Sequence, residues 1–331
     1  MILHPAILAL FVASLLTCLL LCHACWHGGR ILLKWDIRSG SEPQLSLERR
    51  TYLVSTILVY ALAFQLLSLF LFIFTADRLH PLFSGAMCAA GTLNVNRFGY
   101  PLLLMKMVNF MLAGLWLIIN HADTRAHDYP LVRVKYAFLL VIAPLVLLEL
   151  FLQFGYFSRL RADVITSCCG SLFSLDRPGF GGDLASLPPF PAAAAFYGCM
   201  AATFAAGLRY CLTGRGCIPF SLLSGLTLPV AVAALISFFC LYFYELPTHH
   251  CPFCILQDEY GHAGYILYVA LLCGGVTGIG TGLLTPLARP GSMSRVIPPL
   301  QRRLAAITLA CYLVFTLVVT WRVFSSSFRL G

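Results

Sequence analysis

Residues 249–254, His-His-Cys-Pro-Phe-Cys, place two thiols and two imidazoles in one short segment. A C-x-x-C pair can form a disulfide, exchange it with another thiol, or bind a soft metal ion. The segment stands just before the apolar run from Ala263 to Leu284, which is long enough to cross a bilayer. These residues therefore predict thiol or metal chemistry at the end of a membrane helix.

We expect the C-x-x-C pair to occupy the first turn of that helix. Both sulfurs would then lie on one helix face, where the helix dipole and the unpaired N–H groups stabilise a thiolate. Pro252 suits a first helical turn because its missing N–H would have no partner there. Cys251 is the expected attacking thiol and Cys254 the resolving thiol, with His249 and His250 tuning the thiolate or offering nitrogen to a metal.

The composition is that of an integral membrane protein, because 60% of the residues are hydrophobic and only 11% are charged, against about 25% in soluble domains. Eight apolar runs are long enough to span a bilayer. They cover approximately residues 5–26, 51–75, 100–120, 136–157, 193–213, 218–244, 263–286 and 304–324. We expect an all-α, polytopic helical bundle that forms a single membrane domain over residues 1–331.

The distribution of basic residues predicts the orientation. If the loop after the first span is cytoplasmic, the inner segments hold 14 of the 22 Lys and Arg residues. By the positive-inside rule, both termini are then extracytoplasmic. The net charge of +9 is explained by contact with anionic lipid headgroups and does not indicate nucleic-acid binding. The expected location is a bacterial inner membrane, with loops 76–99, 158–192 and 245–262 in the periplasm.

Each of these three outer loops carries cysteine, and together they hold five of the chain's 14. The five are Cys88, Cys168, Cys169, Cys251 and Cys254. In an oxidising compartment, exposed thiols must be paired, bound to metal or turned over. Cys168 and Cys169 are adjacent, so they form either a strained, easily reduced disulfide or a bond from one of them to Cys88. We favour the bond to Cys88.

Residues 251–257, Cys-Pro-Phe-Cys-Ile-Leu-Gln, run into Tyr265 and an apolar helix. This segment resembles the C-x-x-C-[W/I]-x-Q-R motif of disulfide-bond-formation protein B and, more loosely, the C-x-x-C of vitamin K epoxide reductase proteins. The resemblance implies exchange with a second cysteine pair and electron transfer to a quinone. Asp258 stands where that family has an arginine associated with the quinone, so no quinone site is carried over. The family is also a four-helix bundle, whereas this sequence has eight apolar runs.

Three polar side chains fall inside apolar runs: Lys106 and Asn109 in the third, and Glu149 in the fourth. Such residues are costly in lipid and by default face a polar interior. We weigh two alternatives for Lys106, a buried polar pocket or proton path and an ammonium that reaches out to the interface. Gly274, Gly278 and Gly282 recur at four-residue spacing and predict a close helix–helix contact.

The activity predicted first is thiol–disulfide exchange on the extracytoplasmic face with a thioredoxin-like protein, in which Cys88 and Cys168 or Cys169 form a relay pair. A quinone is implied by resemblance only. The alternative is a copper or zinc site for metal delivery or uptake. Its ligands would come from the five outer-loop cysteines with Met87, His249, His250 and His262. A third possibility is a non-catalytic subunit of a membrane complex, fastened by structural disulfides.

Overall fold

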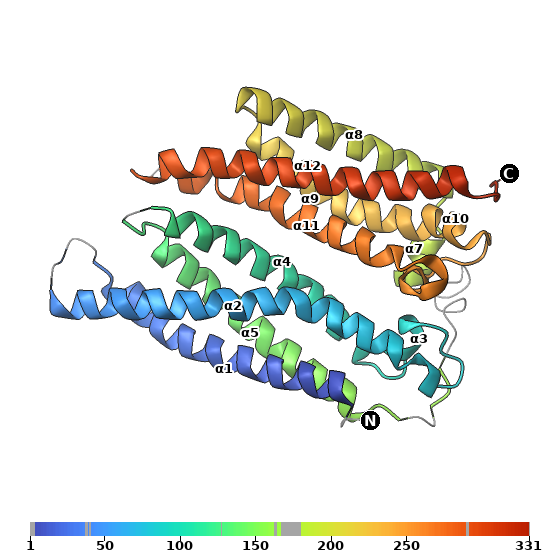
Figure 1. The fold of residues 1–331 in the computed structure, drawn as a ribbon, viewed down its shortest axis with the longest axis horizontal. Helices are drawn as coiled ribbons and strands as arrows, with labels where there is room; N and C mark the ends of the chain where they lie inside the picture. The colour runs from blue at the N-terminus through green and yellow to red at the C-terminus, as the bar shows by residue number, and fades with distance from the viewer. Residues whose placement is uncertain are drawn as a thin grey trace. The chain divides into compact units, whose positions relative to one another are not determined.

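The computed structural model describes residues 4–36, 39, 41–126, 128–161, 164–166, 180–288 and 291–330. The secondary structure of this part of the chain is helical throughout (Figure 1). Eight of its helical segments are long and apolar enough to cross a membrane, as the sequence predicts. An integral membrane protein follows from this number and length of apolar helices.

The long helices are α1 (Pro5–Lys34), α2 (Glu42–Arg78), α4 (Gly99–Thr124), α5 (Val132–Ser158), α8 (Pro189–Thr213), α9 (Cys217–Ala234), α11 (Ala263–Leu283) and α12 (Met293–Ser325). The π-helix η2 (Leu235–Phe239) and α10 (Cys240–Tyr244) continue α9 and complete the sixth span. Shorter elements are η1 (His80–Leu82), α3 (Ala89–Leu93), α7 (Phe180–Ala185), η3 (Cys254–Leu256), η4 (Asp258–Tyr260) and η5 (Pro286–Ala288).

Most helices extend beyond the apolar runs that predict them. The second begins at Glu42 and the last at Met293, about two and a half and about three turns before their apolar runs. Hydropathy marks only the part of a helix that is apolar enough to lie in the hydrocarbon core, whereas the helical hydrogen bonds continue into the polar flanks. The eighth span ends at Ser325, where the N–H of Ser326 bonds to the carbonyl of Arg322 at 3.0 Å.

The chain packs as two compact units. Unit 1 comprises Met1–Thr75, Asn96–Arg161 and Pro286–Leu300, and unit 2 comprises Ala76–Val95, Ala162–Thr285 and Gln301–Gly331. The segment that carries Cys88 therefore belongs to the same unit as the C-x-x-C segment. Both units fall within the stretch that we expected to form one membrane domain.

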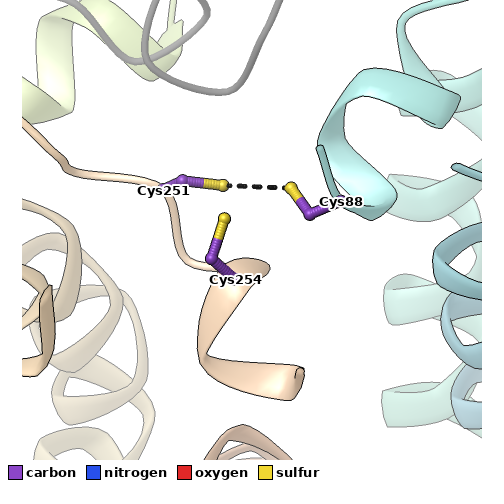
Figure 2. Close-up of side chains that lie close together, drawn as sticks. All are labelled: Cys88, Cys251 and Cys254. Atoms are coloured by element: carbon purple, nitrogen blue, oxygen red, sulfur yellow. Dashed lines mark hydrogen bonds between the residues drawn. The ribbon is translucent and has the colours of Figure 1, made fainter. Parts of the chain in front are cut away.

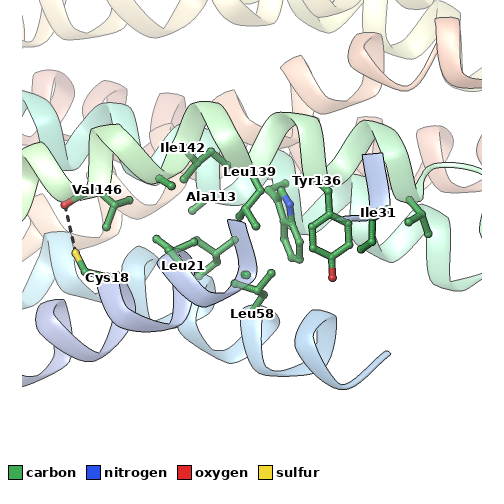
Figure 3. Close-up of a cluster of buried hydrophobic side chains, with 14 of the residues drawn as sticks. Cys18, Leu21, Ile31, Leu58, Ala113, Tyr136, Leu139, Ile142 and Val146 are labelled. Carbon is green, nitrogen blue, oxygen red and sulfur yellow. Dashed lines mark hydrogen bonds between the residues drawn. The ribbon is translucent and has the colours of Figure 1, made fainter. Parts of the chain in front are cut away.

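Unit 1 is built around α5, against which α1 and α4 pack. Tyr136, Leu139, Ile142 and Val146 form one face of α5 at helical spacing and are buried against Leu21 and its neighbours on α1 (Figure 3). The hydroxyl group of Tyr136 lies 3.2 Å from that of Ser55 on α2. An apolar face thus joins α5 to α1, and the hydrogen-bonded hydroxyl group of Tyr136 joins α5 to α2.

In unit 2, the glycine stripe of α11 lets other helices approach its backbone. A Cβ at Gly274 would lie 2.4 Å from Tyr312 of α12, and a Cβ at Gly278 would lie 1.8 Å from Oγ of Ser224 on α9. At Gly282 the corresponding distance to Oγ of Ser221 is 2.3 Å. All three are below any real contact distance, so the predicted close packing of α11 is confirmed.

We predict that Gly278→Ala destabilises the protein by about 2 kcal/mol, because the added methyl group overpacks the contact with α9. Gly198→Ala is the matched control, since a Cβ at that helical position meets nothing within 4 Å. The control should leave stability unchanged or raise it slightly. Unfolding in mixed micelles with a denaturing detergent measures both, and equal stability of the two variants would contradict the packing argument.

Candidate functional site

Three cysteine side chains converge in unit 2. The sulfur atoms of Cys88, Cys251 and Cys254, named here the thiol triad, all lie within 4.8 Å of one another. The sulfurs of Cys88 and Cys251 face each other at 3.6 Å, and that of Cys254 points toward them (Figure 2). Cys88 and Cys251 have no exposed surface and Cys254 is 6% exposed. A cluster from two loops that are far apart in sequence is therefore enclosed by protein.

Cys88 stands directly before the short helix α3, with an extended backbone. The N–H of Ala89 donates to Oδ1 of Asp77, at the end of α2, at 3.1 Å. This bond ties the residue after Cys88 to the preceding span and limits how the loop can turn. The loop around Cys88 is thus ordered by a side-chain bond to a helix end.

Gly85 and Thr166 hold the other side of this loop. The N–H of Thr166 donates to the carbonyl of Ser84 at 2.9 Å, and its hydroxyl donates to the carbonyl of Gly91 at 2.9 Å. Gly85 has φ +87°, and a Cβ there would lie 2.3 Å from the carbonyl oxygen of Thr166. Only glycine fits this conformation and this approach. The Cys88 loop is therefore bound to the chain that follows the fourth span.

The C-x-x-C pair does not occupy the first turn of a helix, and that prediction is wrong. Cys251 lies in irregular backbone, Cys254 begins the short 3-10 helix η3, and α11 starts only at Ala263. Gly261 and His262 both have positive φ, 59° and 55°, so α11 cannot extend back along the chain to the thiols. The sulfurs therefore do not belong to the first turn of α11, where the predicted stabilisation of a thiolate by the helix dipole would act.

Side chains from two helices bind the backbone at the C-x-x-C pair. The hydroxyl group of Tyr244 donates to the carbonyl of Cys251, and that of Tyr268 donates to the carbonyl of Pro252. The thiol of Cys240 also approaches the carbonyl of Cys251, at 3.7 Å. The sequence did not single out these three residues. A tyrosine on each side of a segment that contains proline was the available signal.

The two loops of the triad are also bonded to each other. The amide of Gln257 donates to the carbonyl of Met87 at 2.7 Å, one residue before Cys88. The Met87 side chain itself is 62% exposed. Met87 thus contributes its backbone to the site, while the residue itself stays exposed and is not enclosed with the sulfurs.

His250 is anchored away from the sulfurs. Its Nδ1 lies 2.9 Å from the carbonyl of Ile236, which belongs to the π-helix η2. Because a carbonyl only accepts, Nδ1 carries the proton. A π-turn shifts the hydrogen-bond pattern from i+4 to i+5, and here one of its carbonyls binds a side chain. This bond therefore ties His250, the residue directly before Cys251, to the sixth span.

The other predicted imidazoles have neighbours of their own. The ring of His249 packs edge-on against Tyr244, with centroids 4.3 Å apart. Nδ1 of His262 lies 2.6 Å from the carbonyl oxygen of Leu256, and its Nε2 lies 2.6 Å from the carboxylate of Asp258. In the part of the chain that the structure describes, no imidazole nitrogen joins the three clustered sulfurs. The predicted ligand set is thus reduced to its cysteines.

Cys168 and Cys169 lie outside the described residues, so their pairing with Cys88 stays a prediction. Thr166, two residues earlier in the sequence, is the described residue that bonds to the Cys88 loop.

Unit 1 contains a separate buried polar cluster around Glu149. Its carboxylate accepts from Nζ of Lys106 at 2.6 Å, from the amide of Asn109 at 2.6 Å, and from the amide of Gln65. Nζ of Lys106 also donates to the hydroxyl group of Ser68 at 2.7 Å. Lys106 and Glu149 are each 1% exposed. The alternative in which the ammonium reaches outward is wrong, and the interior ion pair joins α2, α4 and α5.

A second buried ion pair was not predicted from the sequence. Nζ of Lys135 lies 2.8 Å from Oδ2 of Asp123 and 3.0 Å from Oδ1 of Asn120. Oδ1 of Asp123 accepts from the N–H of Leu131 at 2.8 Å. This pair closes the connection between α4 and α5 and has a structural role.

No family model, curated protein or solved structure matches this chain. The geometry of the thiol triad therefore carries the functional argument.

We predict that Lys106→Met lowers the free energy of unfolding by about 3 kcal/mol, because it leaves the Glu149 carboxylate buried without its counterion. The double variant Lys106→Met/Glu149→Leu should recover much of this loss, since no unpaired charge remains. Detergent unfolding of both variants tests the pair. A double variant no more stable than the single variant would show that the charge pair is not the source of the loss.

Proposed function

We propose that this protein is a membrane thiol–disulfide oxidoreductase whose exchange site is the thiol triad. The observation that carries the proposal is the third sulfur. A disulfide needs two cysteines, and here Cys88 lies 3.6 Å from Cys251 while all three sulfurs are within 4.8 Å of one another. Disulfide exchange requires such a third thiol beside the bond that it attacks.

The exchange step conserves electrons. Starting from a Cys251–Cys254 disulfide, the Cys88 thiolate attacks the sulfur of Cys251. A Cys88–Cys251 bond forms, the Cys251–Cys254 bond breaks, and Cys254 leaves as a thiolate that takes up a proton. The 3.6 Å separation must close to the disulfide length of about 2.05 Å. Cys251 is the sulfur shared by the two alternative disulfides, in keeping with its predicted role as the reactive thiol of the pair.

Oxidising equivalents enter or leave by exchange with a disulfide or dithiol of an extracytoplasmic, thioredoxin-like protein. The triad is enclosed, so a relay through Cys168 or Cys169 to Cys88 is the route that we propose to the partner. Quinone reduction is retained only as the resemblance implies it. Asp258, which replaces the arginine of that family, pairs with His262 in this chain.

The loops that carry the triad follow the second and sixth spans, so they end on the same side of a bilayer if each span crosses once. We propose that this side is extracytoplasmic, in a bacterial cytoplasmic membrane, because most of the Lys and Arg residues flank the opposite ends of the spans. An oxidising space is also where a disulfide relay would persist.

A soft-metal site is the second candidate, and the mutual proximity of three sulfurs favours it. Three thiolates about 2.3 Å from one tetrahedral zinc ion are about 3.8 Å apart, within the separations found in the triad. Copper(I) also prefers thiolate ligands. Burial of the triad suits a closed metal site, because reactive cysteines are usually partly exposed.

Trapping the cysteine states tests the first proposal. The full-length protein is equilibrated in a glutathione buffer, quenched with acid, denatured, alkylated and mapped by mass spectrometry. We expect both the Cys251–Cys254 and the Cys88–Cys251 disulfides in exchange. Cys88→Ser should retain the former and lose at least about tenfold in the rate of exchange with a thioredoxin-like protein. Cys273→Ser, which alters a half-buried cysteine of α11, is the control and should keep the wild-type rate.

Metal analysis of protein purified under reducing conditions tests the second candidate. The exchange proposal predicts far less than one copper or zinc ion per chain. One ion per chain, lost in Cys88→Ser and kept in Cys273→Ser, would replace exchange by metal binding. A triad that stays oxidised in mild reductant and binds no metal would instead indicate a structural disulfide in a non-catalytic subunit.

A further inference from the structure

We propose that Tyr244 and Tyr268 are positioning residues of the thiol triad. Their phenol groups hold two consecutive carbonyls of the C-x-x-C segment and thereby keep the sulfur of Cys251 directed at Cys88. The inference rests on the proposed function, since positioning matters only if sulfurs exchange. The two tyrosines would thus control the equilibrium between the Cys88–Cys251 and Cys251–Cys254 disulfides without touching the reacting sulfurs.

The segment needs such bonds because it has no regular secondary structure. Residues 245–253 form neither helix nor strand, and Pro247 and Pro252 have no N–H with which to make backbone bonds. The segment nevertheless buries Cys251 completely. Buried carbonyls must be paired, and near a bilayer the partners must come from the protein.

Three consecutive residues are each tied by a side-chain hydrogen bond. The imidazole of His250 donates to the carbonyl of Ile236, the carbonyl of Cys251 accepts from Tyr244, and the carbonyl of Pro252 accepts from Tyr268. The donors come from opposite sides in sequence, since Tyr244 ends α10 and Tyr268 lies in the second turn of α11. The segment is therefore held between the sixth and seventh spans.

The phenols are also close to the reacting groups. Tyr244 binds the carbonyl of Cys251 itself, and Tyr268 binds that of the next residue, Pro252. A thiolate released during exchange would thus form beside two hydroxyl dipoles whose direction is set by their bonds to carbonyls. Loss of one hydroxyl should change the position of Cys251 and the relative stability of the two disulfides.

Phenylalanine substitutions test this in the full-length protein. Tyr244→Phe and Tyr268→Phe remove one hydroxyl group each, and each should lower the ratio of Cys88–Cys251 to Cys251–Cys254 disulfide by about tenfold, the effect of one lost buried hydrogen bond. Tyr242→Phe on α10 and Tyr265→Phe on α11 are matched controls, because neither hydroxyl donates a hydrogen bond among the described residues. The controls should change the ratio less than about twofold. The ratio is read by acid trapping and mass spectrometry in a glutathione buffer.

Each outcome decides between defined alternatives. Lower thermal stability of Tyr244→Phe and Tyr268→Phe with an unchanged disulfide ratio would make the tyrosines merely structural and overturn the inference. If one variant does not fold, the other decides, because either is expected to shift the ratio. Failure of both to fold would assign the phenols to folding and also overturn it. A wild-type protein that forms no disulfide within the triad would instead refute the proposed function, and the inference with it.

Discussion

Backbone carbonyls that are buried near a bilayer must find donors within the protein, and this constraint governs the thiol site. A helix satisfies its own carbonyls, whereas the irregular chain around Cys251 does not. Two phenols, of Tyr244 and Tyr268, meet this need, and the imidazole of His250 ties the same chain to the carbonyl of Ile236. The same bonds determine where the Cys251 sulfur points. The hydrogen bonds that pair the buried carbonyls therefore also set the geometry of the thiols.

Enclosure of the sulfurs has two chemical consequences. It brings Cys88 to 3.6 Å from Cys251, which favours exchange within the protein over exchange with solvent thiols. It also keeps a large partner from reaching the pair directly, since Cys254, the most exposed of the three, is only 6% exposed. An internal relay and a closed metal site are the two functions that agree with both facts. They differ in whether a third thiolate attacks sulfur or binds an ion.

The two units handle intramembrane polarity differently. Unit 1 buries charge, and it neutralises the Glu149 carboxylate with Lys106 and two amide donors. Unit 2 uses small residues and hydroxyl groups where α11 meets its neighbours, as at Gly278 and Ser224. Replacing a charge pair with apolar residues is often tolerated, but removing one partner is not. A methyl group at the glycine stripe has no room at all.

The amino-acid sequence by itself determined the class of protein, the number of spans and the face of α11 that packs, because hydropathy and small-residue spacing act through local chain geometry. It also predicted that Cys88 and the C-x-x-C pair lie in loops on one side of a membrane. Only the tertiary structure decided that these thiols meet, that they precede α11 without joining it, that Lys106 turns inward to Glu149, and that Tyr244 and Tyr268 bind the C-x-x-C backbone. Each of these depends on contacts between residues far apart in sequence, which no local pattern encodes.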